Sequence, residues 1–159
     1  MSTLLLTSAV TSISPNTTVI LNHNISNTSV FAAIETENKT FRKLPNGIGM
    51  AEWLAASDQM NTLTKINFTD DKNQMMQDYQ LFGWKFFNNK NSALLLVNLL
   101  ATPLKLNVAD ITKQNATYEM KYAGKNDIIN SAADIKYKTG TISNSTIELP
   151  GYSVTIIKG

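Results

Sequence analysis

The chain has one histidine, His23, which is a candidate for a role in catalysis. A hydrolytic Ser-His-Asp triad would have to use it, because no second imidazole could act as the base. The chain contains no Gly-x-Ser-x-Gly segment, which presents the nucleophile in many hydrolases. One histidine without cysteines is also a poor basis for a metal site. We therefore predict no catalytic residue, no metal site and no cofactor in this chain.

Acidic residues at two places could bind a cation or act as acid and base. Glu35 and Glu37 alternate after an apolar run and would share one face of a strand. Asp70, Asp71 and Asp78 offer the oxygen ligands that Ca²⁺ prefers, but the Asp-x-Asp-x-Asp-Gly spacing of a calcium loop is missing. A solvated strand edge explains the glutamates more simply, and a polar loop explains the aspartates.

Aromatic side chains are concentrated in residues 79–87, which are typical of a strand. Phe82, Trp84 and Phe86 occupy alternate positions and would form a stripe on one face. An exposed stripe could stack on sugar rings, as in carbohydrate-binding modules. A core face explains the same pattern, because each ring buries about 150–250 Å² on folding. We favour the core.

The composition is that of a globular protein with one sizeable core. The chain has 159 residues, 43% of them hydrophobic and 16% charged. A net charge of +2 without any basic run excludes an electrostatic argument for nucleic-acid binding. The longest apolar stretches, residues 4–6 and 94–101, are too short for a membrane span. The N-terminus lacks a basic region and a cleavage site, so we expect no signal peptide in this chain.

Asn-x-Ser/Thr sequons are frequent and could indicate glycosylation in a secreted eukaryotic protein. Chance is the simpler explanation, because Asn, Ser and Thr are all abundant. The sequons begin at Asn16, Asn24, Asn27, Asn38, Asn67, Asn115 and Asn144.

The first 62 residues mix helical and strand patterns. Residues 3–13 carry apolar side chains at helical spacing, and residues 17–21 and 29–34 are β-branched and apolar. A turn at residues 44–47 precedes a helix predicted over residues 48–61. Its packed face is expected to carry the following residues: Met50, Trp53, Leu54, Ser57 and Met60.

From residue 63 onward the pattern becomes that of antiparallel strands. Strands are predicted at residues 63–68, 79–87, 92–100, 104–108, 117–122, 141–149 and 152–158. In the last strand, Tyr152, Val154 and Ile156 share one face and are expected to form its core side. We predict a mainly β fold, with a short α/β segment (residues 1–62) followed by an antiparallel β-sandwich (residues 63–159).

The C-terminal residues carry a resemblance. Residues 149–154 read Leu-Pro-Gly-Tyr-Ser-Val, and residues 93–99 form an apolar strand. Together they resemble the C-terminal β-sandwich that follows the (β/α)8 barrel in many glycoside hydrolases, whose last strand often reads Leu-Pro-x-Tyr-Ser-Val/Leu. In that alignment residues 19–22 would be barrel strand eight and residues 48–61 helix eight. Arabinofuranosidase-like, glucuronidase-like and agarase-like enzymes share this layout, so the family is not resolved.

The resemblance implies an accessory role. In such enzymes the two catalytic carboxylates lie on barrel strands four and seven, which would precede this chain. We therefore expect no hydrolysis by the chain alone. The resemblance places His23 at the rim of the substrate pocket, with Asn22 and Trp84 as further candidate substrate-binding residues. Taken without the resemblance, His23 is more simply a loop histidine with no ligand.

The resemblance also implies partners and a location. Carbohydrate is one partner class, and the missing barrel portion or another copy of the chain is the second. The location would be extracellular or periplasmic. Two alternatives stay open: a free-standing carbohydrate-binding β-sandwich, and a β-rich surface or filament subunit that assembles through unpaired strand edges.

Overall fold

The computed structural model describes residues 34–35, 42–43, 45–113, 115–124, 126–127, 129 and 132–159. The elements predicted before Ile34 lie outside these ranges, as do His23, Asn22 and Glu37. Within the ranges no helix is both long and apolar enough to span a membrane.

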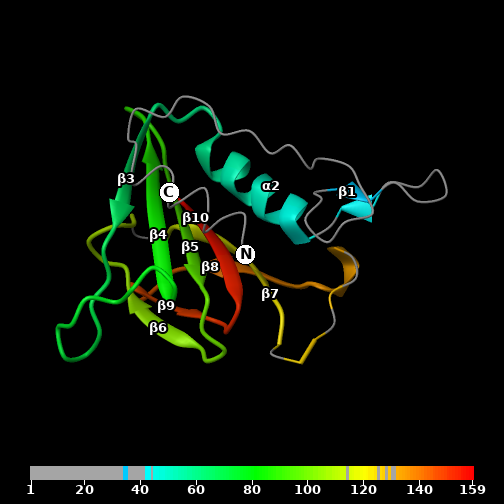
Figure 1. Cartoon of the computed structure of the whole chain (residues 1–159). Helices are drawn as coiled ribbons and strands as arrows, with labels where there is room; N and C mark the ends of the chain where they lie inside the picture. The colour runs from blue at the N-terminus through cyan, green and yellow to red at the C-terminus, as the bar shows by residue number, and fades with distance from the viewer. Residues whose placement is uncertain are drawn as a thin grey trace.

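An antiparallel six-stranded sheet forms the centre of the molecule (Figure 1). Its strands are, in spatial order, β3 (Thr62–Ile66), β4 (Leu81–Phe87), β5 (Ser92–Asn98), β10 (Ser153–Lys158), β7 (Thr117–Tyr122) and β8 (Lys136–Thr141). A two-stranded sheet pairs β6 (Leu104–Asn107) with β9 (Thr146–Leu149), and another pairs β1 (Ile34–Glu35) with β2 (Arg42–Lys43). The helices in the described part of the chain are α2 (Pro45–Ser57) and the short 3₁₀ helix η1 (Ala132–Asp134). The predicted fold class, mainly antiparallel β after a short helical segment, is confirmed.

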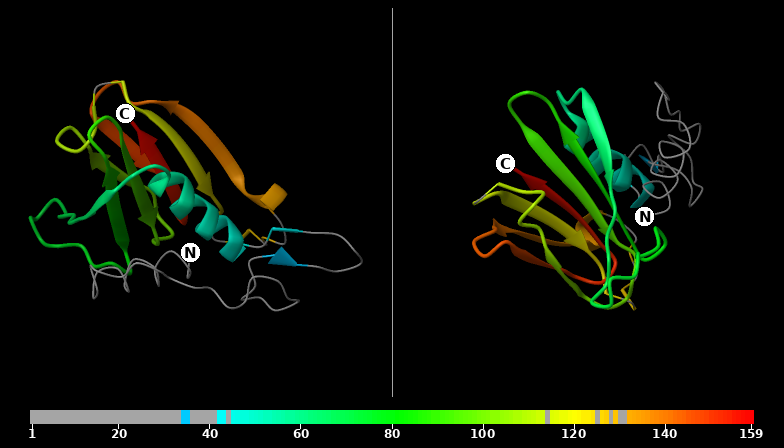
Figure 2. Two further views of the ribbon diagram at one scale, coloured as in Figure 1. Left: turned by 90° about the horizontal axis from the view of Figure 1, so that it is seen from above. Right: turned by 90° about the vertical axis from the view of Figure 1, so that its left-hand side faces the viewer.

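One face of the central sheet packs against α2, and we call it the helix face (Figure 2). Its buried side chains come from β4, β5 and β10, with Ala56 from α2. They are Phe82, Trp84, Phe86, Ala93, Leu95, Val97, Val154 and Ile156. The aromatic stripe of β4 therefore lies in the core, as favoured from the sequence.

The opposite face packs against β6 and β9, and we call it the ribbon face. Its buried side chains are mostly aliphatic: Leu81, Leu94, Leu96, Val108, Ala116, Met120, Ile142, Ile147, Leu149 and Ile157. Strands β5 and β10 are thus buried on both sides, which explains their continuous apolar runs. The prediction that only one side of β10 is core was incomplete, because Ser153, Thr155 and Ile157 are buried as well.

Two predicted elements were wrong in detail. The strand predicted over residues 141–149 is two strands, β8 and β9, in different sheets. Ser145 lies between them with φ of 54°, a left-handed conformation that turns the chain. The helix begins at Pro45, since proline suits the first helical position, and ends before Gln59, which has φ of 58°.

The packed side of α2 also differs from the prediction. Ile48, Glu52 and Ala56 are buried at helical spacing, and Trp53 and Met60 pack beside them. Leu54, expected on this side, is 65% exposed. The pattern could not choose the side, because almost every position of α2 is apolar or small. α2 and the central sheet share one core. The predicted domain boundary between residues 62 and 63 stays a prediction.

Candidate functional site

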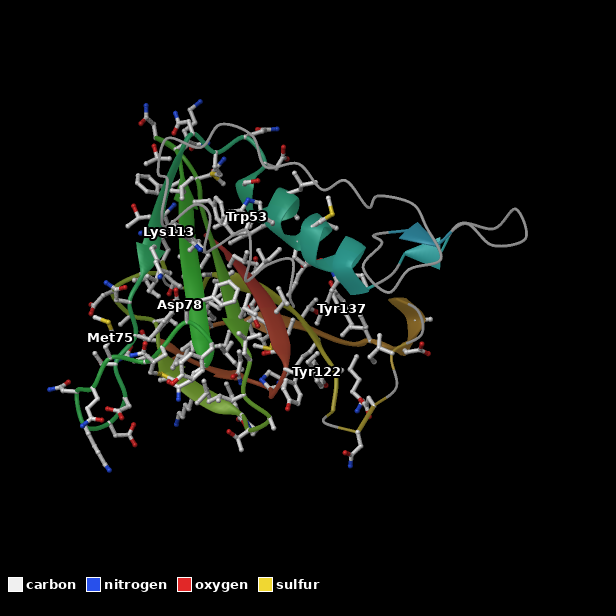
Figure 3. All side chains as sticks on the ribbon, viewed as in Figure 1. Trp53, Met75, Asp78, Lys113, Tyr122 and Tyr137 are labelled. Carbon is white, nitrogen blue, oxygen red and sulfur yellow. The ribbon has the colours of Figure 1, made fainter. Side chains whose placement is uncertain are left out.

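Of the three predicted substrate-binding residues, only Trp84 lies in the described part of the chain. It is 3% exposed and sits beneath α2. Trp53 of α2, labelled in Figure 3, packs edge-on against it, with ring centroids 6.1 Å apart. Trp53 also packs edge-on against Phe86, with ring centroids 5.2 Å apart. A sugar ring could reach Trp84 from solvent only if α2 moved away.

The carboxylates predicted as alternative cation ligands are dispersed. Asp70 Oδ1 accepts hydrogen bonds from the backbone N–H groups of Lys72 and Gln74, which closes its own loop. Asp78 instead forms an ion pair with Lys65 at 2.5 Å. Across the described ranges no three acidic, histidine or cysteine side chains are grouped to hold a metal ion. Glu35 lies in β1, but its side chain is outside the described part.

A buried ion pair joins α2 to the sheet, and sequence reasoning missed it. Glu52, the one charged residue of α2, is 4% exposed and pairs with Lys121 of β7. The signal was present, since a lone glutamate in an otherwise uncharged helix needs a partner if it is buried. The pair joins α2 to β7 on the helix face, beside the packing of Ala56 and Trp53.

A second missed residue, Asn98, organises the ribbon face. Its side chain is fully buried at the end of β5. The Nδ2 atom donates to the carbonyl oxygens of Thr102 at 3.0 Å and Pro150 at 2.9 Å, and Oδ1 accepts from the N–H of Leu100 at 3.0 Å. One amide therefore holds the β5–β6 loop against the β9–β10 turn. A polar residue ending an apolar run was the available signal.

The β9–β10 turn explains the Leu-Pro-Gly-Tyr-Ser-Val motif in physical terms. Leu149 fills the ribbon-face core, and the carbonyl oxygen of Pro150 accepts from Asn98 and from Ser153 Oγ. A Cβ on Gly151 would lie 2.2 Å from the carbonyl oxygen of Ala101, so only glycine fits. Tyr152 adopts φ of 50°, and its N–H donates to the carbonyl oxygen of Leu100. The turn thus carries the chain from one sheet to the other.

A third polar group lies on the surface near the end of β7. Asp127 accepts a hydrogen bond from the Gly124 N–H at 2.6 Å and pairs with Lys136 at 2.9 Å. The Gly124 bond, followed by the Lys136 ammonium, lowers the pKa of Asp127 below its usual value. The same pairing raises the pKa of Lys136. Both groups are in contact with solvent, so this pair is a surface feature.

Comparison with known proteins gives a fold relationship. No family model and no curated protein sequence matches the chain. The chain is similar to the catalytic domain of a GH30 xylanase C from Talaromyces cellulolyticus, with a TM-score of 0.54 and 13% identity over 84% of this chain. It is also similar to a family 51 α-L-arabinofuranosidase from Bifidobacterium longum, with a TM-score of 0.54 and 14% identity over 80% of this chain.

A GH30 subfamily 8 xylanase from Clostridium acetobutylicum gives a TM-score of 0.52 and 14% identity over 83% of this chain. The chain spans only 28%, 28% and 31% of the lengths of these three proteins. Identities this low establish the fold alone. The chain therefore shares the fold of a minor part of glycoside hydrolase chains.

Proposed function

We propose that this chain is an accessory portion of a glycoside hydrolase, comprising the last helix of its barrel and the β-sandwich that follows. The observation that carries the proposal is the fold similarity, in which four fifths of this chain superposes on less than a third of each enzyme. The Leu-Pro-Gly-Tyr-Ser-Val turn supports it, because the motif's residues form the crossing between the two sheets.

The proposed role is structural. Such a portion must hold a helix rigidly on the outside of a sheet, so that a barrel packed on the helix keeps its position. The ring contacts of Trp53 with Trp84 and Phe86 suit this role, and so does the buried pair between Glu52 and Lys121. In this proposal the helix is α2, and the sheet stiffens it.

The chain is not proposed to catalyse hydrolysis alone. A retaining glycosidase needs two carboxyl groups roughly 5 Å apart across the scissile bond. In the described ranges, Glu52, Asp78 and Asp127 are each paired with a lysine, and Asp70 closes its own loop. These arrangements support a structural use of the carboxylates. An extracellular or periplasmic location is part of the proposal, since one structural neighbour is an exported protein from Bacteroides fragilis.

The carbohydrate-binding alternative receives less support. It would use either an exposed row of aromatic rings or His23, and the rings of Phe82, Trp84 and Phe86 are buried. Substrate contacts by His23 and Asn22 stay part of the main proposal, at the rim of a pocket that a barrel would complete.

Two experiments test the proposal. Sequencing the transcript upstream of Met1 should reveal an in-frame segment that encodes a barrel with two catalytic carboxylates. A stop codon directly upstream, followed by a translation start at Met1, would contradict the proposal.

In the second experiment the purified chain is incubated with aryl-xylosides, aryl-arabinofuranosides and xylan. No product is expected, because the carboxylates would be supplied by the barrel. Turnover that survives repurification and disappears in Glu35→Gln or His23→Ala would overturn the accessory role. Gel retardation by xylan that is lost in His23→Ala would favour the binding module instead.

A further inference from the structure

The loop between β3 and β4 carries two neighbouring methionines in different surroundings. Met75 is 62% exposed, whereas Met76 is partly buried and packs against the ribbon-face core. Figure 3 shows Met75 on this loop, at the edge of the molecule, and Figures 1 and 2 show the loop away from α2. A partner that covers the outer side of α2 would therefore leave Met75 in contact with solvent.

The backbone around Met75 is held in a small hairpin. Thr69 and Met75 form an antiparallel bridge, and the Asp70 N–H donates to the carbonyl oxygen of Gln74 at 2.9 Å. Asp70 Oδ1 closes the turn by accepting from the N–H groups of Lys72 and Gln74. The exposure of Met75 is thus a property of a hydrogen-bonded hairpin in the folded chain.

The other methionines of the described part are shielded to a greater extent. Met120 is 1% exposed within the ribbon-face core, and Met60 packs against the helix-face core. The N–H of Met76 donates to the carbonyl oxygen of Phe68 at 2.9 Å, which holds Met76 beside the same core as Met120. Because the oxidation of a side-chain sulfur depends on its exposure, Met75 is the most reactive of these sulfur atoms.

We propose that Met75 is a site of reversible modification by peroxides. A lone pair of its Sδ atom attacks one oxygen of hydrogen peroxide, so that an S–O bond forms and the O–O bond breaks. The second oxygen keeps both protons and leaves as water. The sulfur loses two electrons to the peroxide and becomes methionine sulfoxide. A methionine sulfoxide reductase reverses the change, with two thiols supplying the electrons and becoming a disulfide while the oxygen leaves as water.

The modification should be tolerated at Met75 and damaging at Met76. A sulfoxide on Met75 would lie in water, where its polar oxygen costs nothing to accommodate. On Met76 the same oxygen would be placed against the aliphatic ribbon-face core. Two adjacent residues of one type therefore differ in what oxidation does to the fold.

Peroxide treatment followed by tandem mass spectrometry of the peptides measures the rate at each methionine. Met75 should react about ten times faster than Met76 or Met120, because susceptibility follows exposure. Met76→Leu is the matched control and should leave the rate at Met75 unchanged. In Met75→Leu, Met76 should stay slow, because packing shields it. Equal rates at Met75 and Met76 in the wild type would overturn the proposal.

The protein oxidised at Met75 provides the second measurement. Its melting temperature should equal that of the untreated chain, and methionine sulfoxide reductases with dithiothreitol should restore the original mass. Longer treatment that also oxidises Met76 should lower the melting temperature. A lower melting temperature after oxidation of Met75 alone, or a sulfoxide that the reductases do not remove from the folded chain, would overturn the proposal of a tolerated, reversible site.

Discussion

The two faces of the central sheet are closed in different ways. The ribbon face is covered by β6 and β9, and the covering chain is held by backbone and amide hydrogen bonds around Asn98. The helix face is covered by α2, which, among the described residues, is attached by aromatic contacts and by the ion pair of Glu52 with Lys121. The ribbon face is therefore fixed through the main chain, whereas the helix face depends on a few side chains. Single substitutions can test this difference.

The largest effect should come from a charge on the helix face. Val154→Asp would bury a second carboxylate beside Lys121, which lies opposite Val154 on β7 and already pairs with Glu52. One of the two carboxylates would stay without a partner, at a cost of several kcal/mol. Thermal melting measures it, with Thr141→Asp as the control, because Thr141 is an exposed residue of β8 opposite the uncharged Thr117. A soluble Val154→Asp protein with an unchanged melting temperature would show that β10 is peripheral.

Substituting the two residues of the Glu52–Lys121 ion pair should lower stability by different amounts. Lys121→Met leaves the buried Glu52 carboxylate without its partner and should cost about 3 kcal/mol. Glu52→Gln should cost about 1 kcal/mol, because the Lys121 side chain is 31% exposed and its ammonium can reach water. Urea denaturation gives both values. Equal costs for the two variants would mean that the pair does not hold α2 in place.

The turn on the ribbon face should be intolerant of any side chain. Gly151→Ala places a methyl group against the Ala101 carbonyl oxygen and should cost about 1–3 kcal/mol, since backbone cannot move aside cheaply. Gly124→Ala is the matched control. Its new Cβ would meet the Asp127 carboxylate, which is the movable end of an exposed side chain, so little change is expected. Similar losses in the two variants would contradict the close main-chain contact.

A smaller effect, of opposite sign, is expected at the centre of β10. Thr155 is fully buried on the ribbon face, and its Oγ1 has no hydrogen-bond partner within the described part of the chain. Thr155→Val keeps the shape and removes the unsatisfied hydroxyl, so stability should rise by about 1 kcal/mol. Calorimetry would detect this gain, and Thr155→Ser should not show it.

The smallest effect concerns pH. Because the pKa of Asp127 is lowered in the folded chain, its contribution to stability is present above its unfolded value near 3.8 and is lost as the pH falls below it. At pH 7 the free energy of unfolding of the wild type should be slightly higher than that of Asp127→Asn. This difference should vanish in strong acid. The effect is small because the pair with Lys136 is exposed. A difference that grows toward low pH would contradict the assignment.

Much of the fold followed from local pattern. Strand β7 was predicted with its observed bounds, and β4 and β5 within two residues, because their apolar or alternating runs leave no other structure. The wrong predictions concern features that the local sequence pattern does not determine. Residues 141–149 read as one strand because a left-handed Ser145 leaves no mark in the sequence. The outward position of Leu54 depended on a tertiary contact, the Glu52–Lys121 pair.

The candidate site was less predictable than the fold. The sequence analysis assigned Trp84 both to a core stripe and to substrate binding. Trp84 lies in the core, because α2 covers the face of the sheet that carries it. The roles of Asn98 and Glu52 depend on partners 52 and 69 residues away, Pro150 and Lys121, which no local pattern connects. The residues assigned to carbohydrate by resemblance, His23 and Asn22, remain predictions.

The place of β10 in the sheet has a consequence for biosynthesis. The last strand of the sequence lies in the middle of the sheet, between β5 and β7, and bonds to both. During translation the β3–β4–β5 and β7–β8 parts can form earlier, but the sheet cannot join them until residues 153–158 leave the ribosome. Folding must then wait for contacts between distant parts of the chain, which are slow to form. A chain truncated before Ser153 would leave β5 and β7 each with an unpaired edge, and unpaired strand edges promote aggregation.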